Sequence, residues 1–179
     1  VFGTSPGNLW AGGRAGLLAH SKNGSWFPQF SPTQSDLNSM WGSAPDNIVT
    51  VGDEGAIVRF NGVVWTLEQA PSNAHLYGVW GTAVDNMFAV GQGIALHRGS
   101  QGWKSLDGAP QTTLRGIWGA GATQFVAVGD DGNVWQYDGT FTSTDLGLNG
   151  IALRAITGIP AQSMWAVGDM GTVMRWTPD

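Results

Sequence analysis

An all-β fold built from small repeated sheets is the fold class that the sequence predicts, and three observations support it. A Trp-Gly phrase or its near equivalent recurs along the chain, with its glycines at positions 3, 42, 81, 119 and 158, so the period is 38 or 39 residues. Each period contains up to four short apolar runs of strand length. Gly, Asp, Asn or Pro bounds each run, and these residues form turns. Four antiparallel strands in a repeat of about 40 residues predict a β-propeller, in which each sheet is one blade that covers its neighbour.

The repeat at 76–113 shows the predicted strands in order. The first, 76–81, ends in Trp80-Gly81, and the others are 86–91, 93–98 and 102–106. None has the length or the period of a helix. We expect the first strand to lie innermost, because small residues occupy its third place in four repeats: Ser39, Gly78, Gly116 and Ala155.

The turns of the other repeats follow the same plan. An Asp-X-Gly turn follows the second strand at 53–55, 130–132 and 169–171. Glycine takes the positive φ there and the aspartate caps the turn. Asn8, Asn47 and Asn86 are also expected to form turns. We expect indole rings to fill the space between blades, as the structural core of the repeat: Trp41, Trp80, Trp118, Trp65 and Trp103.

We therefore predict a single β-propeller domain over residues 1–179 with about five four-stranded antiparallel blades. The repeats span about 1–36, 37–75, 76–113, 114–152 and 153–179, and the first and last are incomplete. A closed five-blade ring with one three-stranded blade is the preferred arrangement. The alternatives are an outer strand supplied by a partner and a parent protein with more blades. An unpaired blade edge would favour a homo-oligomer.

Composition excludes several classes of function. The chain has no cysteine, which rules out disulfides and thiolate metal sites. Its net charge of −5 and its two lysines argue against nucleic-acid binding. Because no apolar run approaches ~18 residues, membrane insertion is not expected. A charged share of only 12%, with 10 tryptophans, favours an extracellular or periplasmic protein.

The repeat pattern also supports a resemblance. It reads Trp-Gly-Ser/Thr-x-x-Asp-Asn-x-x-x-Val-Gly-Asp-x-Gly, an apolar strand, then Asn/Asp-Gly-x-x-Trp, and it is clearest at 41–65 and 118–141. It resembles a family of secreted bacterial β-propeller repeats similar to Asp-box and photosystem-assembly-factor-like propellers. The Asp-box itself is only approximated, at 21–26, which departs from the sialidase pattern. The resemblance implies the fold, while such repeats serve binding proteins, assembly factors and glycosidases alike.

The residues with the greatest chemical potential are mostly assigned structural roles. His20 and His97 take a third-strand place that other repeats give to Arg or Gln, which indicates an outward polar position. The acidic pairs Asp53-Glu54 and Asp130-Asp131 are typical of turns, although such pairs can also bind hard cations. Neither a nucleophile-base set nor a phosphate loop is present. We therefore predict no catalytic residue, no metal site and no cofactor, and do not expect an enzyme.

The second place of the first strand differs between repeats and is the best candidate for a ligand site. It holds Asn38, Tyr77, Arg115 and Arg154, which should ring the mouth of the central channel. Two turn residues expected on the same face, Glu54 and Asp131, complete the predicted set. Both arginines could bind a carboxylate or a sugar hydroxyl. Alternatively, they pair with Asp130 or Asp169 of nearby turns.

A non-catalytic binding module is the function that these observations favour. Carbohydrate binding, lectin-like, through pockets between blades or on the top face is the first hypothesis, because aromatic faces beside polar groups suit sugars and several equivalent sites give avidity. Protein–protein interaction or an assembly scaffold is the alternative. A glycoside hydrolase using aspartates from different blades ranks third.

Overall fold

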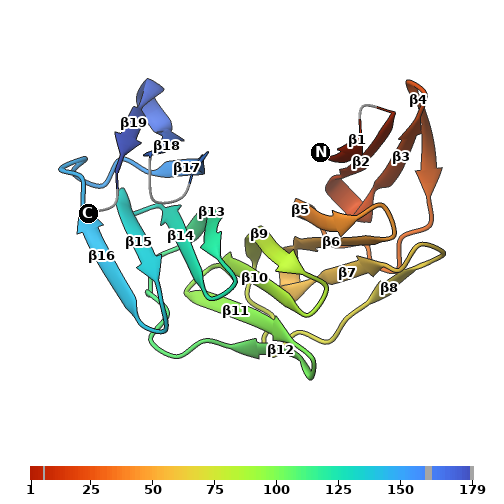
Figure 1. The fold of residues 1–179 in the computed structure, drawn as a ribbon, viewed down its shortest axis with the longest axis horizontal. Helices are drawn as coiled ribbons and strands as arrows, with labels where there is room; N and C mark the ends of the chain where they lie inside the picture. The colour runs from red at the N-terminus through yellow and green to blue at the C-terminus, as the bar shows by residue number, and fades with distance from the viewer. Residues whose placement is uncertain (6, 160–162, 178–179) are drawn as a thin grey trace.

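The computed structural model describes residues 1–5, 7–159 and 163–177, and this part of the chain folds into five antiparallel sheets (Figure 1). Each sheet is a meander whose strands pair in chain order, and each is one blade. Blade 1 comprises β1 (Phe2–Ser5), β2 (Asn8–Gly12), β3 (Leu18–Lys22) and β4 (Ser25–Gln29). Blade 2 comprises β5 (Leu37–Ala44), β6 (Asn47–Gly52), β7 (Ile57–Phe60) and β8 (Trp65–Leu67).

The remaining blades repeat this order. Blade 3 comprises β9 (Leu76–Ala83), β10 (Asn86–Gly91), β11 (Ile94–Gly99) and β12 (Gly102–Ser105). Blade 4 comprises β13 (Leu114–Gly121), β14 (Gln124–Gly129), β15 (Asn133–Tyr137) and β16 (Phe141–Asp145). Blade 5 comprises β17 (Leu153–Ile159), β18 (Ser163–Gly168) and β19 (Val173–Trp176), so it has three strands within the described residues. The all-β propeller with an incomplete last repeat is therefore confirmed.

The first strand of each blade lies innermost. Strand β9 contacts both β5 and β13, and β13 contacts β17. Small residues allow this close approach: a Cβ added to Gly116 would lie 3.0 Å from the Cα of Ala155, and one added to Gly78 would lie 3.0 Å from Ile117. The predicted role of the small third residue is confirmed.

The Asp-X-Gly turns differ from the prediction in one respect. Asp53–Gly55 and Asp169–Gly171 form short 3₁₀ turns in which the middle residue, as well as the glycine, has a positive φ: 56° for Glu54 and 56° for Met170. In the third turn of this kind, Asp130–Gly132, only the glycine has a positive φ, 75°. The prediction placed that conformation on glycine alone, which holds for 130–132 and is corrected for 53–55 and 169–171.

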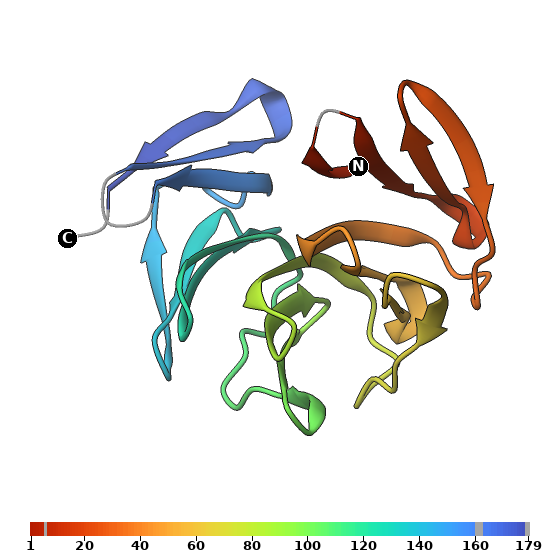
Figure 2. The same ribbon diagram turned by 45° about the vertical axis from the view of Figure 1, so that its right-hand side comes forward.

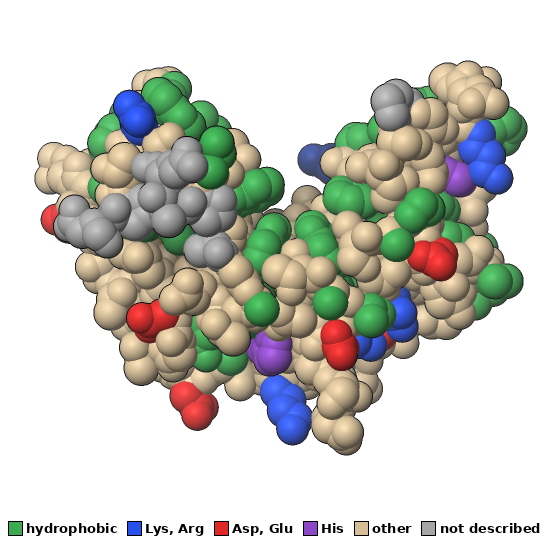
Figure 3. Space-filling model, viewed as in Figure 1, with side chains coloured by type: hydrophobic (Ala, Val, Ile, Leu, Met, Phe, Trp, Pro, Cys, Tyr) green, Lys and Arg blue, Asp and Glu red, His purple; other side chains and the backbone are tan. Residues whose placement is uncertain are grey.

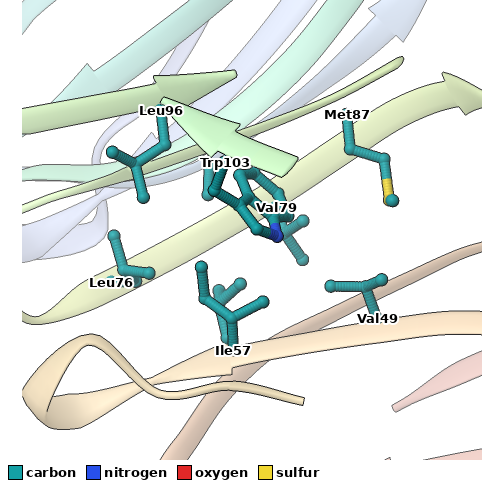
Figure 4. Close-up of a cluster of buried hydrophobic side chains, with 9 residues drawn as sticks. Val49, Ile57, Leu76, Val79, Met87, Leu96 and Trp103 are labelled. Atoms are coloured by element: carbon teal, nitrogen blue, oxygen red, sulfur yellow. The ribbon is translucent and has the colours of Figure 1, made fainter. Parts of the chain in front are cut away.

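Apolar cores form between consecutive blades. Between blades 2 and 3, Val49, Val51 and Ile57 meet Met87, Ala89, Leu96 and Trp103 (Figure 4). Equivalent clusters join blades 1 and 2, blades 3 and 4, and blades 4 and 5. Trp65 and Trp103 are fully buried in these cores, while the Trp-Gly tryptophans are half-buried against them. Indole rings between blades are thus confirmed.

The five blades form an open arc, which corrects the preferred closed ring. Blades 1 and 5 stand apart in both ribbon views (Figures 1 and 2), and a notch separates them in the space-filling view (Figure 3). The four buried clusters all join consecutive blades. The rotation between successive blades is too small for five of them to close a circle. Within the described residues, no helix has the length and apolarity required to span a membrane.

Candidate functional site

The channel-mouth site, defined as Asn38, Tyr77, Arg115 and Arg154 with the turn aspartates beside them, is built from equivalent places in four blades. Asn38 Nδ2 donates to Asp53 Oδ1 at 2.8 Å. Arg115 Nε and Nη2 donate to the two carboxylate oxygens of Asp130, each at 2.7 Å. Arg154 Nε donates to Asp169 at 2.8 Å. The spacing is 15 residues each time, because the second residue of an inner strand lies beside the turn that ends its antiparallel partner.

Blade 3 departs from this pattern, and Arg115 of blade 4 contacts its Tyr77. Gln92 stands where blades 2, 4 and 5 have aspartate, so the turn of blade 3 offers no carboxylate to Tyr77. The Arg115 guanidinium instead lies over the Tyr77 ring, 4.6 Å from its centroid. Arg154 Nη1 also reaches Asp130 at 3.3 Å. Blades 3, 4 and 5 are therefore linked at the mouth by a cation–π contact and shared ion pairs.

These contacts fix the charge state of the site. Hydrogen bonds from Arg115 lower the pKa of Asp130 below 3.8, more than burial raises it, and both arginines add attraction. The bond from Arg154 lowers the pKa of Asp169 in the same way. Both carboxylates are ionised at neutral pH, and the two guanidinium charges are balanced. The predicted alternative, in which the arginines pair with nearby aspartates, is what the structure contains.

A cavity of about 250 Å³ opens beside this network along the inner strands. Its lining includes Tyr77, Arg115 and Arg154, together with the small residues Ser39, Gly78 and Gly116. Half-exposed guanidinium and phenol groups therefore stand over a recess that small residues keep open. Such a recess has room for one side chain of a bound segment.

The two remaining predicted ligand residues lie within their own turns. Glu54 is exposed, and Ser35 Oγ donates to its carboxylate at 3.4 Å. Asp131 accepts from the backbone N–H of Asn133 at 3.1 Å and from Trp135 Nε1 at 2.9 Å. The bonds of Asp131 stabilise a turn and a strand. The structure brings Tyr77, Arg115 and Arg154 together, while Asn38 bonds Asp53 and the Leu76 carbonyl outside the cavity lining. Glu54 and Asp131 also lie outside that cluster.

Two inter-blade pockets form a second candidate site. The first, between blades 1 and 2, has a volume of about 800 Å³ and is lined by Asn8, Trp10 and His20 opposite Phe60 and Gly62. The second, between blades 3 and 4, has a volume of about 470 Å³. Residues at the same repeat positions line it: Asn86, Phe88 and His97 opposite Tyr137 and Gly139.

The histidines of these pockets are held in the same way. His97 Nε2 shares a hydrogen bond with Asn86 Oδ1 at 2.9 Å, and His20 has the same partner in Asn8. The ring of His20 stacks on Trp10 at 3.8 Å. Burial lowers the pKa of both histidines below 6.5, and Lys22 lowers that of His20 further. They are neutral, half-buried pocket residues, which corrects their predicted outward position.

Between blades 2 and 3, an ion pair lies at the position that the pockets occupy between blades 1 and 2 and between blades 3 and 4. Glu68 accepts from Arg98 Nε and Nη2, both at 2.9 Å, and from Trp103 Nε1 at 2.7 Å. Sequence reasoning missed this residue. Its signal was weak, because Glu68 follows a three-residue outer strand and its partners belong to the next repeat. Among the described residues, no group of three or more potential metal-ligating side chains converges.

Comparison with known proteins supports the fold. Neither a known family model nor a curated protein sequence matches the chain. Over 98% of its length it is similar to the structure of YCF48 bound to D1 peptide, with a TM-score of 0.72 and 13% identity, and it covers 62% of that chain. It is also similar to virginiamycin B lyase from Staphylococcus aureus (TM-score 0.76, 12% identity, 98% of this chain, 68% of that chain). The RRP9 WD40 repeats are a further match (TM-score 0.79, 10% identity, 98% of this chain, 60% of that chain).

These likenesses show a β-propeller fold. At such low identity, they do not extend to activity or ligand. The chain spans 60% to 68% of the length of the three structures.

Proposed function

We propose that the protein is a protein-interaction module that binds an extended peptide segment of a partner at the channel-mouth site. The observation that carries this proposal is the ring of Tyr77, Arg115 and Arg154 around a recess along the inner strands. Arg and Tyr are over-represented among the residues that dominate protein interfaces. One of the similar structures, YCF48, holds a D1 peptide, which supports the same class of function.

The chemistry of the site favours a polar peptide over a free anion. Both guanidinium groups already face carboxylates, so a simple anion would have to displace Asp130 or Asp169. A peptide can add hydrogen bonds to the free faces of these groups without breaking the pairs, and it can place one side chain in the recess. Arg154 is exposed and offers the most accessible donors.

Peptide selection tests this proposal. A displayed library of random peptides is selected on the protein, and the affinity of the enriched peptides is then measured by fluorescence anisotropy. Because Arg154 is exposed, Arg154→Gln should leave the fold intact while weakening binding by about tenfold. The control is Lys104→Gln, an exposed change on the outer strand β12. Peptides that bind both variants like the parent protein would place the interaction elsewhere and contradict the proposal.

Carbohydrate binding is the second candidate, and the two equivalent inter-blade pockets favour it. Each pocket combines an aromatic ring, a neutral imidazole and an amide, and each is open to solvent. Uncharged hydrogen-bonding groups beside aromatic faces match the hydroxyl groups and apolar faces of sugars. Two such pockets on one molecule would give avidity for a multivalent glycan.

A glycan array with a matched pair of variants tests the second candidate. Phe27 borders the first pocket and is 51% exposed, while Phe30 is 80% exposed and lies outside the lining. Phe27→Ala should reduce binding of an array-positive glycan several-fold, and Phe30→Ala should not. Equal loss in both variants, or an empty array, would reject these pockets as sugar sites.

A further inference from the structure

Blade 5 presents an apolar face to the notch. Trp165, Val167 and Val173 are 47%, 44% and 62% exposed. The pairing of strands within each blade shows that their equivalents in blade 4 are Val126, Val128 and Val134, which are at most 4% exposed. Those three are buried because blade 5 covers them. The exposed face of blade 5 therefore carries the residue pattern of a covered surface.

Blade 1 presents the opposite kind of face on the other wall of the notch. This face carries Leu9, Ala11, Ala19 and Trp26. Their equivalents in the repeat of blade 3 are Met87, Ala89, Leu96 and Trp103. Trp103 is 7% exposed because blade 2 packs on it, whereas Trp26 is 47% exposed. Figure 3 shows hydrophobic side chains along the notch between the two arms.

The two faces are the two halves of one standard interface. Each of the four buried clusters joins a face at the repeat positions of Val126, Val128 and Val134 to a face at the repeat positions of Met87, Ala89, Leu96 and Trp103. Apolar faces left open to water carry a substantial free-energy cost, and contiguous ones mark interaction sites. The faces that border the notch are the two that remain unmatched in the described residues.

We propose that the notch is a docking surface for a further blade of the same repeat class. Its occupant is a β-meander that turns a Met/Ala/Leu/Trp-type face to blade 5 and a Val-type face to blade 1, and so completes the ring. The interface is a continuation of the four already present. This inference is independent of the ligand bound at the channel mouth.

A second copy of the whole chain fits this surface less well. Its blade 1 would match the exposed face of blade 5, since head-to-tail contacts pair unlike surfaces. Its other four blades would then follow the same curvature across the notch toward blade 1 of the first copy. Those four blades would collide with blade 1 of the first copy, whereas an occupant of one or two blades would not.

Extension of the full chain tests the proposal. Arg175 of blade 5 occupies the repeat position of Arg59 in blade 2. A residue added directly after Asp179 therefore takes the repeat position of Val64. A copy of residues 64–113 fused after Asp179 supplies an outer strand for blade 5 and one further blade, and a copy of 64–152 supplies two. We expect one of the two extended chains to show at least a threefold loss of ANS fluorescence, a blue shift of tryptophan emission and a Tm higher by about 5 °C or more.

Two substitutions make the test specific. Val167→Asp in the extended chain should restore ANS binding and cancel the Tm gain, because it charges the docking face of blade 5. Val63→Asp, at a residue that is 83% exposed on blade 2, should change neither. If both extensions remain protease-sensitive and leave ANS binding unchanged, the proposal is overturned. It is also overturned if the unextended chain self-associates in sedimentation velocity and Val167→Asp abolishes the association, since the occupant would then be a second copy.

Discussion

At the residue scale, a three-part hydrogen-bond motif recurs in blades 1 to 3. The asparagine that begins the second strand donates to a Ser or Thr hydroxyl four residues earlier, and its carbonyl oxygen meets a His or Arg of the third strand. In blade 2 these residues are Ser43, Asn47 and Arg59. The asparagine was predicted to form the turn, but it is the first residue of the second strand, and its side chain bridges the turn to the first strand.

Removal of the central asparagine should destabilise the blade. Asn47 is buried, and Asn47→Ala would leave the Ser43 hydroxyl and the Arg59 side chain without it. We expect a loss of ~1–3 kcal/mol in the free energy of unfolding, measured by urea titration. Gln124 occupies the same place in blade 4 and is exposed, so Gln124→Ala is the matched control. Equal losses in both variants would show that the motif has no particular weight.

The pocket histidines should make stability depend on pH. Burial lowers the pKa of His97 in the folded protein. At a pH between this lowered pKa and the ordinary value of 6.5, the unfolded chain therefore binds more protons than the folded protein. Stability is therefore greatest above about pH 6.5 and falls as the pH drops through the folded pKa. Blade 4 has Gln136 in the equivalent place. His97→Gln should keep a side chain able to bond Asn86 and reduce the slope of Tm against pH between 7 and 5.5. An unchanged slope would assign the dependence to other groups.

At the scale of the element, the Trp-Gly phrase makes close contacts between blades at two junctions. A Cβ at Gly119 would lie only 1.8–2.0 Å from the ring of Trp80 in the preceding blade. Likewise a Cβ at Gly42 would lie 2.9 Å from Phe2. At these two junctions the aromatic residue of one repeat packs on the glycine of the next, whereas a Cβ at Gly81 or Gly158 would first meet the second strand of its own blade.

Gly119→Ala should therefore be costly although alanine is small. The indole of Trp80 must move for the methyl group to fit, and such overpacking costs about 1–3 kcal/mol. Gly121 lies in the same strand with no atom within 4 Å of an added Cβ, so Gly121→Ala is a close control. Thermal melts of the two variants should separate clearly. Similar Tm values would mean that the Trp80 ring can move away from an added methyl group at little cost in stability.

The inter-blade ion pair should contribute stability that acid removes. Burial raises the pKa of Glu68, but hydrogen bonds from Arg98 and Trp103 outweigh it, so the pKa lies below 4.5. A carboxylate with a lowered folded pKa stabilises fully above its unfolded value and loses that contribution as the pH falls through the folded value. Glu68→Gln should cost ~1–3 kcal/mol at pH 7 and flatten the stability curve below pH 4.5. Glu54→Gln, at the exposed glutamate, should do neither.

At the scale of the whole molecule, the sequence predicted what repeats and failed where the repeats differ. The 39-residue period, the turn residues and the small inner residues were sufficient for blade order and strand positions. Ring closure depends on the rotation between blades, which no single residue encodes. The sharing of Asp130 by Arg115 and Arg154, and the capture of Glu68 by the next blade, are contacts between repeats. Pattern analysis of one repeat at a time cannot reveal them.

The open arc also predicts unequal stability along the chain. Each blade in the middle is covered on both faces, whereas blade 5 is covered on one face and has three strands within the described residues. In repeat folds, stability is close to a sum of repeat and neighbour-interface contributions, so a blade with one interface should open more readily.

Hydrogen exchange measures this difference directly. Amides of β18 should exchange faster than those of β10 and β14, although all three are central strands with similar sequences. We expect protection in β18 to be at least tenfold lower at neutral pH. Leu9 and Ala11 lie on the uncovered face of blade 1, but Trp10 and Leu18 of that blade are buried against blade 2, so β2 should show intermediate protection. Uniform protection from β2 to β18 would mean that the arc unfolds as one cooperative unit despite its exposed ends.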